Sequence, residues 1–392
     1  MREVQDFREM FPFYTQGNDD IIYLDNANTS QILDSSLKDY VYTNVEGTFN
    51  IGRGQYKGSR ETETKIARAK SLAAEFIGGT ADSIIFTSGA TMGLNMIARS
   101  LYKGNRLTVL TTELEHASAV LPWMAIEQGM VHIEFIKLTN DYELTLENVK
   151  AGLDKYKPDI LLLASMTNTT GEVRDLKGIG NLLQGTDTIF VVDHAQGAAH
   201  VKIDVSACGI DYLAFSLHKM YGPKGVGVLY AKDVNTISPY CFGGGMNKTF
   251  SKEGTFELED GEQKFLAGTQ NLTSICASTS VFKFFINHWE EIEEKEQEIA
   301  LFAHYLFKEI PGIKIYSSEL SPILLFNLQD FDALDVSEIM DEHNICIRAG
   351  NHCAKLTKDL FGLSTCRLSL GIYNTTEDIK RAYQVLKKEV IK

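Results

Sequence analysis

Four consecutive residues, Ser216-Leu217-His218-Lys219, place a hydroxyl, an imidazole and an amine directly after a predicted strand that ends at Phe215. Ligands of parallel α/β sheets bind at the carboxyl ends of the strands, so these side chains stand where a ligand is expected. An amine whose pKa is lowered by burial and by neighbouring cations can form a Schiff base with an aldehyde. Lys219 is therefore predicted to bind an aldehyde covalently.

Other strand ends carry residues that suit the remaining parts of one aldehyde cofactor. After the strand predicted at 84–87, a turn of small residues opens a helix, and its backbone N–H groups at Ala90 together with the Thr91 hydroxyl can hold a phosphate. Asp193 follows another apolar strand, and its carboxylate can keep a pyridine nitrogen protonated. His116 follows a third strand and can stack on a flat ring while it moves protons. An aldehyde, a phosphate and a protonated pyridine together predict pyridoxal 5'-phosphate as the cofactor.

The elements that position these residues alternate between strands and helices from about residue 21 to residue 231. Several of the strands are apolar throughout, which indicates burial on both faces. An alternating order of this kind predicts an α/β fold with a mostly parallel, seven-stranded sheet between helices. The predicted strands are 84–87, 107–110, 131–135, 160–163, 189–192, 212–215 and 226–230.

The pattern changes after about residue 277, where a long helical stretch (281–309) is followed by short strands and helices. This order is typical of a smaller α+β domain. We therefore predict a large cofactor-binding domain over 21–277 and a small domain made of 1–20 and 278–392.

Composition limits the kind of protein. The net charge is −14, from 38 Lys and Arg against 52 Asp and Glu, so long-range repulsion disfavours nucleic acid and anionic membranes as partners. No apolar stretch approaches the roughly 18 residues needed to span a bilayer, and the acidic residues near the start do not fit a signal peptide. Six cysteines without a C-x-x-C pair fit neither a disulfide framework nor a zinc ribbon. A cytoplasmic protein without a metal is predicted, although a zinc site from His343, Cys346, His352 and Cys353 is an alternative of non-standard spacing.

The ordered set of motifs resembles the class V, fold-type I pyridoxal phosphate enzymes, and most closely the cysteine desulfurases of the SUF-system type. The resemblance extends over nearly the whole chain. It is carried by Val192-Asp193-His194-Ala195-Gln196, Ser216-Leu217-His218-Lys219-Met220-Tyr221-Gly222-Pro223, Leu266-Ala267-Gly268-Thr269-Gln270-Asn271 and Arg348-Ala349-Gly350-Asn351-His352-Cys353-Ala354.

The resemblance implies a role for each matching residue. Lys219, Cys353 and His116 would be catalytic, with Cys353 carrying a persulfide. Asn168 and Gln196 would contact the ring oxygen, and Asp193 the pyridine nitrogen. The phosphate would be bound by Ala90, Thr91, Ser216 and His218, and by Thr269 from the second subunit of a homodimer. Arg367, Asn168 and Arg53 would bind the substrate.

The implied activity converts L-cysteine to L-alanine and passes the sulfur to an acceptor protein, as in iron–sulfur cluster assembly. Selenocysteine lyase, or another class V lyase or epimerase, is the alternative, and dependence on Cys353 separates the two. A non-catalytic scaffold with this fold is a third reading, against which the intact Lys219 and Asp193 argue. The chain departs from the family pattern at Asn351, His194, Gly52 and Ala90, and His194 is expected to add a titratable group near the ring.

Overall fold

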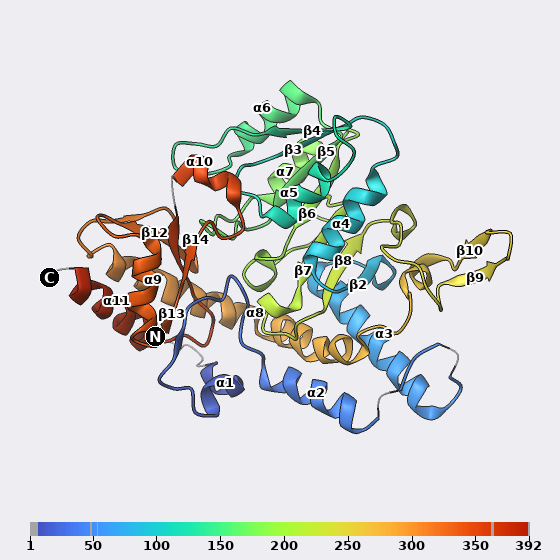
Figure 1. The fold of residues 1–392 in the computed structure, drawn as a ribbon, viewed down its shortest axis with the longest axis horizontal. Coiled ribbons are helices and arrows are strands. Elements are labelled where there is room, and N and C mark those ends of the chain that lie inside the picture. Colours follow the sequence, from blue (N-terminus) through green and yellow to red (C-terminus); the bar gives the residue numbers. More distant parts are fainter. Residues whose placement is uncertain (1–6, 48, 53, 362–363, 391–392) are drawn as a thin grey trace.

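The computed structural model describes residues 7–47, 49–52, 54–361 and 364–390 of the chain. Its centre is a seven-stranded sheet, and each of the seven predicted strands is confirmed (Figure 1). All neighbouring strands are parallel except that β8 runs antiparallel to both β7 and β2. In sheet order the strands are β2 (Ile84–Thr87), β8 (Gly227–Ala231), β7 (Tyr212–Ser216), β6 (Ile189–Asp193), β5 (Ile160–Ala164), β3 (Leu107–Thr111) and β4 (Val131–Phe135).

In every strand of this sheet except the edge strand β4, alternating residues pack into cores on opposite faces. In β5, Ile160 and Leu162 belong to one hydrophobic cluster, and Leu161 and Leu163 belong to the other. Successive side chains of a strand point to opposite faces, and a sheet covered on both sides needs apolar residues at every position. This is the physical reason why the strands read as continuous apolar runs.

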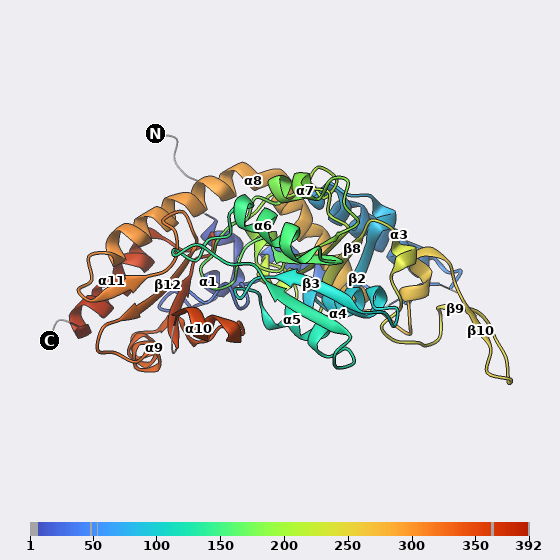
Figure 2. The same ribbon diagram turned by 90° about the horizontal axis from the view of Figure 1, so that it is seen from above.

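Two layers of helices cover the two faces (Figure 2). One face packs against α4 (Ala90–Leu101) and α5 (Ala117–Met124). The other packs against α3 (Lys57–Ile77), α6 (Leu146–Tyr156), α7 (Leu176–Leu183) and α8 (Leu272–Phe307). A further helix, α2 (Asp34–Val45), lies along α8.

A second sheet forms beside the first, with a core of its own built around Phe307, Phe326 and Leu368. Its four antiparallel strands, in sheet order, are β11 (Ile313–Ile315), β12 (Ile323–Leu328), β15 (Thr365–Ser369) and β14 (Arg348–Gly350). The later part of α8, α9 (Ala333–Asp341) and α11 (Thr376–Val390) pack on this sheet. Nearby, β1 (Ile22–Tyr23) pairs in parallel with β13 (Ile345–Cys346).

The long helix α8 contributes to both cores and is kinked at His288, so the predicted boundary at 277/278 lies inside one helix. Phe7, Phe11 and Tyr14, from the segment predicted to join the small domain, pack with the core that holds the seven-stranded sheet. The division into 21–277 against 1–20 and 278–392 stays a prediction.

The remaining elements are short. A hairpin of β9 (Asn247–Phe250) and β10 (Phe256–Leu258) projects from the end of the molecule away from the second sheet (Figure 1). The short α-helices are α1 (Pro12–Thr15) and α10 (Lys358–Phe361). The 3₁₀ helices are η1 (Arg8–Met10), η2 (Ala81–Ser83), η3 (Gly197–Ala199), η4 (Leu217–Lys219), η5 (Val234–Thr236), η6 (Gly261–Phe265) and η7 (Lys355–Thr357).

Within the described ranges, no helix combines the length and the apolar character that crossing a membrane requires. All six cysteines fall inside these ranges, and each is a free thiol there.

Candidate active site

A cavity of about 190 Å³ lies where the carboxyl ends of β5, β6 and β7 face the second sheet. One side of it, the seven-stranded wall, is formed by Ala90, Thr91, His116, Asn168, Asp193, Gln196, Ser216, His218 and Lys219. The other side, the four-stranded wall, is formed by Arg348, His352, Cys353 and Arg367. The two sheets thus bring together residues that are widely separated in the sequence.

Among the described residues, Thr269 is the one predicted site residue that does not line this cavity. Thr269 is exposed, and its hydroxyl accepts a hydrogen bond from Asn50 Nδ2 at 3.4 Å. Since Thr269 was assigned to the site of a second subunit, its role stays a prediction. Arg53 lies outside the described residues.

Lys219 is positioned by the turn that follows β7. Strand β7 ends at Ser216, and the single turn η4 ends at Lys219 itself. The carbonyl oxygen of the preceding His218 accepts hydrogen bonds from the Ser30 backbone N–H (2.8 Å) and from Thr29 Oγ1 (3.1 Å). Burial lowers the pKa of Lys219 to about 8, although the Asp193 carboxylate opposes the shift. The amine is therefore partly neutral near physiological pH.

Asp193 is the last residue of β6 and is buried. Its Oδ1 accepts a hydrogen bond from the Ala195 backbone N–H at 2.9 Å. Burial raises the pKa of Asp193 to about 6, because a carboxylate loses hydration there. A cation placed against this carboxylate would lower the pKa again, so the position suits a positively charged ligand group.

The turn between β2 and α4 is shaped for close contact. Gly89 has φ +152°, and a Cβ atom added at Gly227 would lie only 2.5 Å from Gly89 Cα. Both positions therefore require glycine. The approach lets Ser216 Oγ accept a hydrogen bond from the Ala90 backbone N–H at 2.8 Å. The Ser216 hydroxyl proton stays available to the cavity, beside the positive end of the α4 dipole.

His116 is the N-cap residue of α5 and projects its ring into the cavity. Its Nδ1 accepts a hydrogen bond from the Ser118 backbone N–H at 3.0 Å. Burial, with Lys219 and Arg367 nearby, lowers the pKa of His116 to about 4. The ring is therefore neutral at physiological pH and carries its proton on Nε2.

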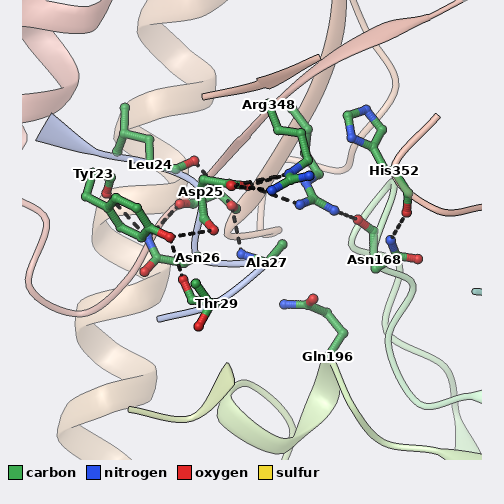
Figure 3. A network of polar contacts seen from close by, with 12 residues as sticks. Tyr23, Leu24, Asp25, Asn26, Ala27, Thr29, Asn168, Gln196, Arg348 and His352 are labelled. Atoms are coloured by element: carbon green, nitrogen blue, oxygen red, sulfur yellow. Dashed lines mark hydrogen bonds and ion pairs between the residues drawn. The ribbon is translucent and has the colours of Figure 1, made fainter. Parts of the chain in front are cut away.

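Cys353 lies on an exposed turn whose backbone is strained. His352 and Cys353 both have positive φ, 50° and 57°, which a non-glycine residue rarely adopts. The turn is fixed by the other wall, since Asn168 Nδ2 donates to the His352 carbonyl oxygen at 2.7 Å and the Ala117 N–H donates to the Cys353 carbonyl oxygen at 2.8 Å. Figure 3 shows the first of these contacts. The thiol is thus presented to the cavity by contacts across it.

The two arginines of the four-stranded wall share one carboxylate, Asp25. Figure 3 shows its contact with Arg348. Arg348 donates to it from Nε (3.1 and 3.2 Å) and from Nη2 (2.9 Å), and Arg367 donates from Nη2 at 3.3 Å. Sequence reasoning gave Asp25 no role in the site. The only signal is the parallel pairing of β1 with β13, which places Tyr23 opposite Cys346, two residues before Asp25 and Arg348. A register between two-residue strands cannot be read from sequence.

His194 is not where we expected it, because its side chain does not line the cavity. It is fully buried on the other side of the strand end, and its Nδ1 lies 2.7 Å from Ser165 Oγ. Consecutive residues of a strand point in opposite directions, so Asp193 facing the cavity turns His194 away. Burial lowers the pKa of His194 to about 3, so it adds no charge near the site.

The zinc alternative has no group of ligands to support it. In the part of the chain that the structure describes, no three His, Cys, Asp or Glu side chains are arranged to hold a metal ion.

Comparison with known proteins agrees with this geometry. The chain belongs to the class V aminotransferase family, whose model matches residues 22–382. It is 30% identical over 371 residues to a cysteine desulfurase of Yersinia pseudotuberculosis serotype O:1b (strain IP 31758), covering 92% of this chain and 91% of that protein.

Solved structures show the same fold. The apo cysteine desulfurase of Thermococcus onnurineus NA1 superimposes with a TM-score of 0.91 at 26% identity and covers all of both chains. The cysteine desulfurase CsdA of Escherichia coli gives a TM-score of 0.87, also at 26% identity, over 97% of each chain. The predicted family and fold are confirmed.

Pyridoxal phosphate is the cofactor of this family, and the cavity fits it. The buried oxygens Asn168 Oδ1 and Gln196 Oε1 have no hydrogen-bond partner among the described residues, although buried polar atoms are rarely left unpaired. Both belong to residues that line the cavity, beside a buried carboxylate and an amine of lowered pKa. This set of donors and acceptors suits a flat polar ring with a phosphate and an aldehyde.

Proposed function

We propose that this protein is a cysteine desulfurase that converts L-cysteine to L-alanine and retains the sulfur on Cys353. The observation that carries the proposal is a thiol, Cys353, on the same cavity wall as Arg367 and in the same cavity as Lys219. A related enzyme that eliminates directly has no need of a thiol at this place. The names of the relatives described above support the same activity.

The proposed roles follow from the position of each group. Lys219 and Asp193 would hold the aldehyde and the ring nitrogen of the cofactor, with Asn168 and Gln196 near the ring oxygen. Ala90, Thr91, Ser216 and His218 would hold the phosphate at the start of α4. The chemistry that pyridoxal phosphate supplies when bound is an aldehyde that condenses with amines and a ring that withdraws electrons from the amino-acid Cα.

Proton movements are assigned to the seven-stranded wall. A pKa of about 8 leaves Lys219 Nζ able to accept a proton from the substrate Cα near physiological pH. His116 stays neutral because its pKa is lowered to about 4, and it holds a proton at Nε2 for a developing negative charge. Arg367 binds the substrate carboxylate through its guanidinium group.

Sulfur transfer is assigned to the four-stranded wall. The Cys353 thiolate attacks the sulfur atom of L-cysteine and forms a sulfur–sulfur bond. The carbon–sulfur bond of the substrate breaks, its electron pair stays with the carbon fragment, and that fragment takes up a proton and leaves as L-alanine. Cys353 is left as a persulfide, which a thiol of an acceptor protein can accept.

The proposal extends to the setting of the enzyme. A homodimer is supported by apolar side chains that project into solvent, among them Val45 at the end of α2 (75% exposed) and Phe250 in the hairpin (79% exposed). Thr269 would then contact the phosphate of the second subunit. Free thiols throughout the chain support a reducing compartment such as the cytoplasm, and iron–sulfur cluster assembly is the proposed destination of the sulfur.

The test is alanine release from L-cysteine by the purified protein loaded with pyridoxal phosphate, with a reductant present. Steady alanine formation that Lys219→Ala abolishes supports the proposal. Alanine release no higher than that of Lys219→Ala would refute it, and selenocysteine would be the next substrate to try.

A further inference from the structure

Arg348 and Arg367 face each other directly across two antiparallel strands. They are register partners in the pairing of β14 with β15. Like charges directly opposite each other on an antiparallel pair repel and destabilise it. The arrangement therefore needs a counter-ion, particularly since the side chain of Arg367 is only 2% exposed.

Asp25 meets that need and contacts both guanidinium groups. Its side chain is 13% exposed, which keeps both ion pairs from being fully screened by water. Two guanidinium groups and one carboxylate leave a net charge of 2 − 1 = +1 at this wall. One positive charge is therefore left for an anion that enters the cavity.

The backbone around Asp25 is held on both sides. The Leu24 N–H donates to the Cys346 carbonyl oxygen (2.9 Å), and the Ser369 N–H donates to the Leu24 carbonyl oxygen (2.7 Å). The Ala27 N–H donates to Ser369 Oγ at 2.9 Å. The carboxylate thus stands at a fixed place before any ligand arrives, which is the requirement for a preorganised site.

Arg367 keeps donors free for a ligand. Its Nη1 donates to the Asn168 carbonyl oxygen at 2.8 Å, and its Nη2 donates to Asp25. Its Nε is buried and has no partner among the described residues. A buried guanidinium donor without a partner indicates a binding site for a carboxylate, which accepts paired N–H groups.

We propose that Asp25 is a positioning residue for the substrate carboxylate, acting as the counter-ion that holds Arg367 in the cavity against the repulsion of Arg348. This inference rests on the proposed function for the identity of the substrate. Asp25 itself is not among the residues that line the cavity. Its effect is transmitted through Arg367, and it depends on the presence of Arg348.

The test is a double-mutant cycle with Asp25→Asn, Arg348→Gln and the double variant, all loaded with cofactor. The dissociation constant of L-alanine is measured by calorimetry, because binding of the product requires no sulfur chemistry. We expect Asp25→Asn to weaken alanine binding about tenfold when Arg348 is present. In the Arg348→Gln background the same change is expected to cost less than about threefold, since the repulsion is gone.

Two controls distinguish a loss of carboxylate binding from a loss of folding stability. Ethylamine, which is L-alanine without its carboxylate, should bind the four proteins with equal affinity. Asp378→Asn removes a carboxylate of similar burial that pairs with Arg8 at 2.8 Å outside the cavity, and it should lower the melting temperature without changing alanine affinity. If Asp25→Asn itself fails to fold, the double variant, which keeps the net charge at +1, supplies the comparison with Arg348→Gln.

An equal loss of alanine affinity in both backgrounds, or no loss in either, would overturn the proposal. So would an equal loss for ethylamine. A failure of the proposed function gives a different result, namely no alanine release from L-cysteine with the Asp25 cycle unchanged.

Discussion

Lys219 and Cys353 line the same cavity, but the fold holds them in different ways. Lys219 follows a buried strand through a single turn. Asp193 ends the neighbouring strand β6, and His116 is the N-cap of α5, the helix that follows β3. Cys353 stands on an exposed turn with two consecutive residues at positive φ, and hydrogen bonds from the opposite wall fix that turn.

The electrostatics of the two walls differ accordingly. On the seven-stranded wall, burial moves the pKa of Lys219 down to about 8 and that of Asp193 up to about 6. On the four-stranded wall, Arg348 is 37% exposed and shares Asp25 with Arg367. Burial inside a sheet can shift the pKa values of acids and bases, whereas a thiol that passes sulfur to another protein has to be accessible. Under the proposed function, the seven-stranded wall would move the protons and the four-stranded wall would carry the sulfur.

The largest effect is expected from Cys353→Ala, which removes only the thiol that is proposed to accept the sulfur. Alanine release from L-cysteine should fall by roughly a thousandfold or more, because no other described thiol lines the cavity. The affinity for pyridoxal phosphate, measured by titrating the cofactor-free protein, should not change. Cys241→Ala, which removes an exposed thiol elsewhere, serves as the matched control.

If Cys353→Ala kept most of its alanine release, the division of labour between the walls would be wrong. Direct elimination would then be the better description, and with it the selenocysteine lyase alternative.

A smaller effect is expected from Asn168→Asp, which removes the hydrogen bond from Asn168 on the seven-stranded wall to His352 on the four-stranded wall. The new carboxylate has no N–H to donate and would repel the His352 carbonyl oxygen that Asn168 Nδ2 now contacts at 2.7 Å. We expect kcat/KM for L-cysteine to fall about ten- to a hundredfold, and iodoacetamide to alkylate Cys353 several times faster, as read by mass spectrometry. Asn181→Asp adds the same charge at an exposed helix position and should change neither value. An unchanged alkylation rate would mean that the turn keeps its conformation without Asn168.

A thermal effect of a few degrees is expected from Lys219→Met in the cofactor-free protein. Because the pKa of Lys219 is about 8 when folded and 10.5 ordinarily, the folded chain binds fewer protons than the unfolded chain between these values. The buried amine is thus fully destabilising below pH 8, and its cost disappears as the pH rises to about 10.5. Lys219→Met should therefore raise the melting temperature at pH 7, with a difference from wild type that shrinks towards pH 10.5.

The exposed Lys224→Met is the control for that series and should show no such pH trend. A difference for Lys219→Met that stayed constant with pH would show that packing, rather than the buried charge, is responsible.

The two walls also differed in how far the sequence predicted them. The seven-stranded wall was predicted well, because the strands that carry it, β6 and β7, are apolar runs that end at the polar residues Asp193 and Ser216, and parallel strand ends meet at one edge. Lys219, Asp193 and His116 therefore fell together as expected. The direction of β8 was not predictable, since a strand buried on both faces reads alike in either direction.

The four-stranded wall depends on pairings that leave little trace in the sequence. Asp25 reaches Arg348 through a pairing of two-residue strands that are far apart in the chain.

His194 was expected near the ring because it adjoins Asp193, but the alternation of a strand turns it away. The hairpin of β9 and β10 was also missed, because its exposed strands carry no apolar pattern to reveal them.

The smallest effect is expected from Asn351→His, which restores the residue that the family pattern favours next to the turn. The Asn351 side chain is exposed and does not line the cavity, so nothing in the proposed chemistry depends on it. We expect kcat/KM for L-cysteine to stay within about twofold of wild type, as surface changes of this kind usually have small effects. A change of tenfold or more, with an unaltered melting temperature, would mean that a second imidazole takes part in sulfur transfer. The four-stranded wall would then supply an imidazole for the reaction, as the seven-stranded wall is proposed to do with His116.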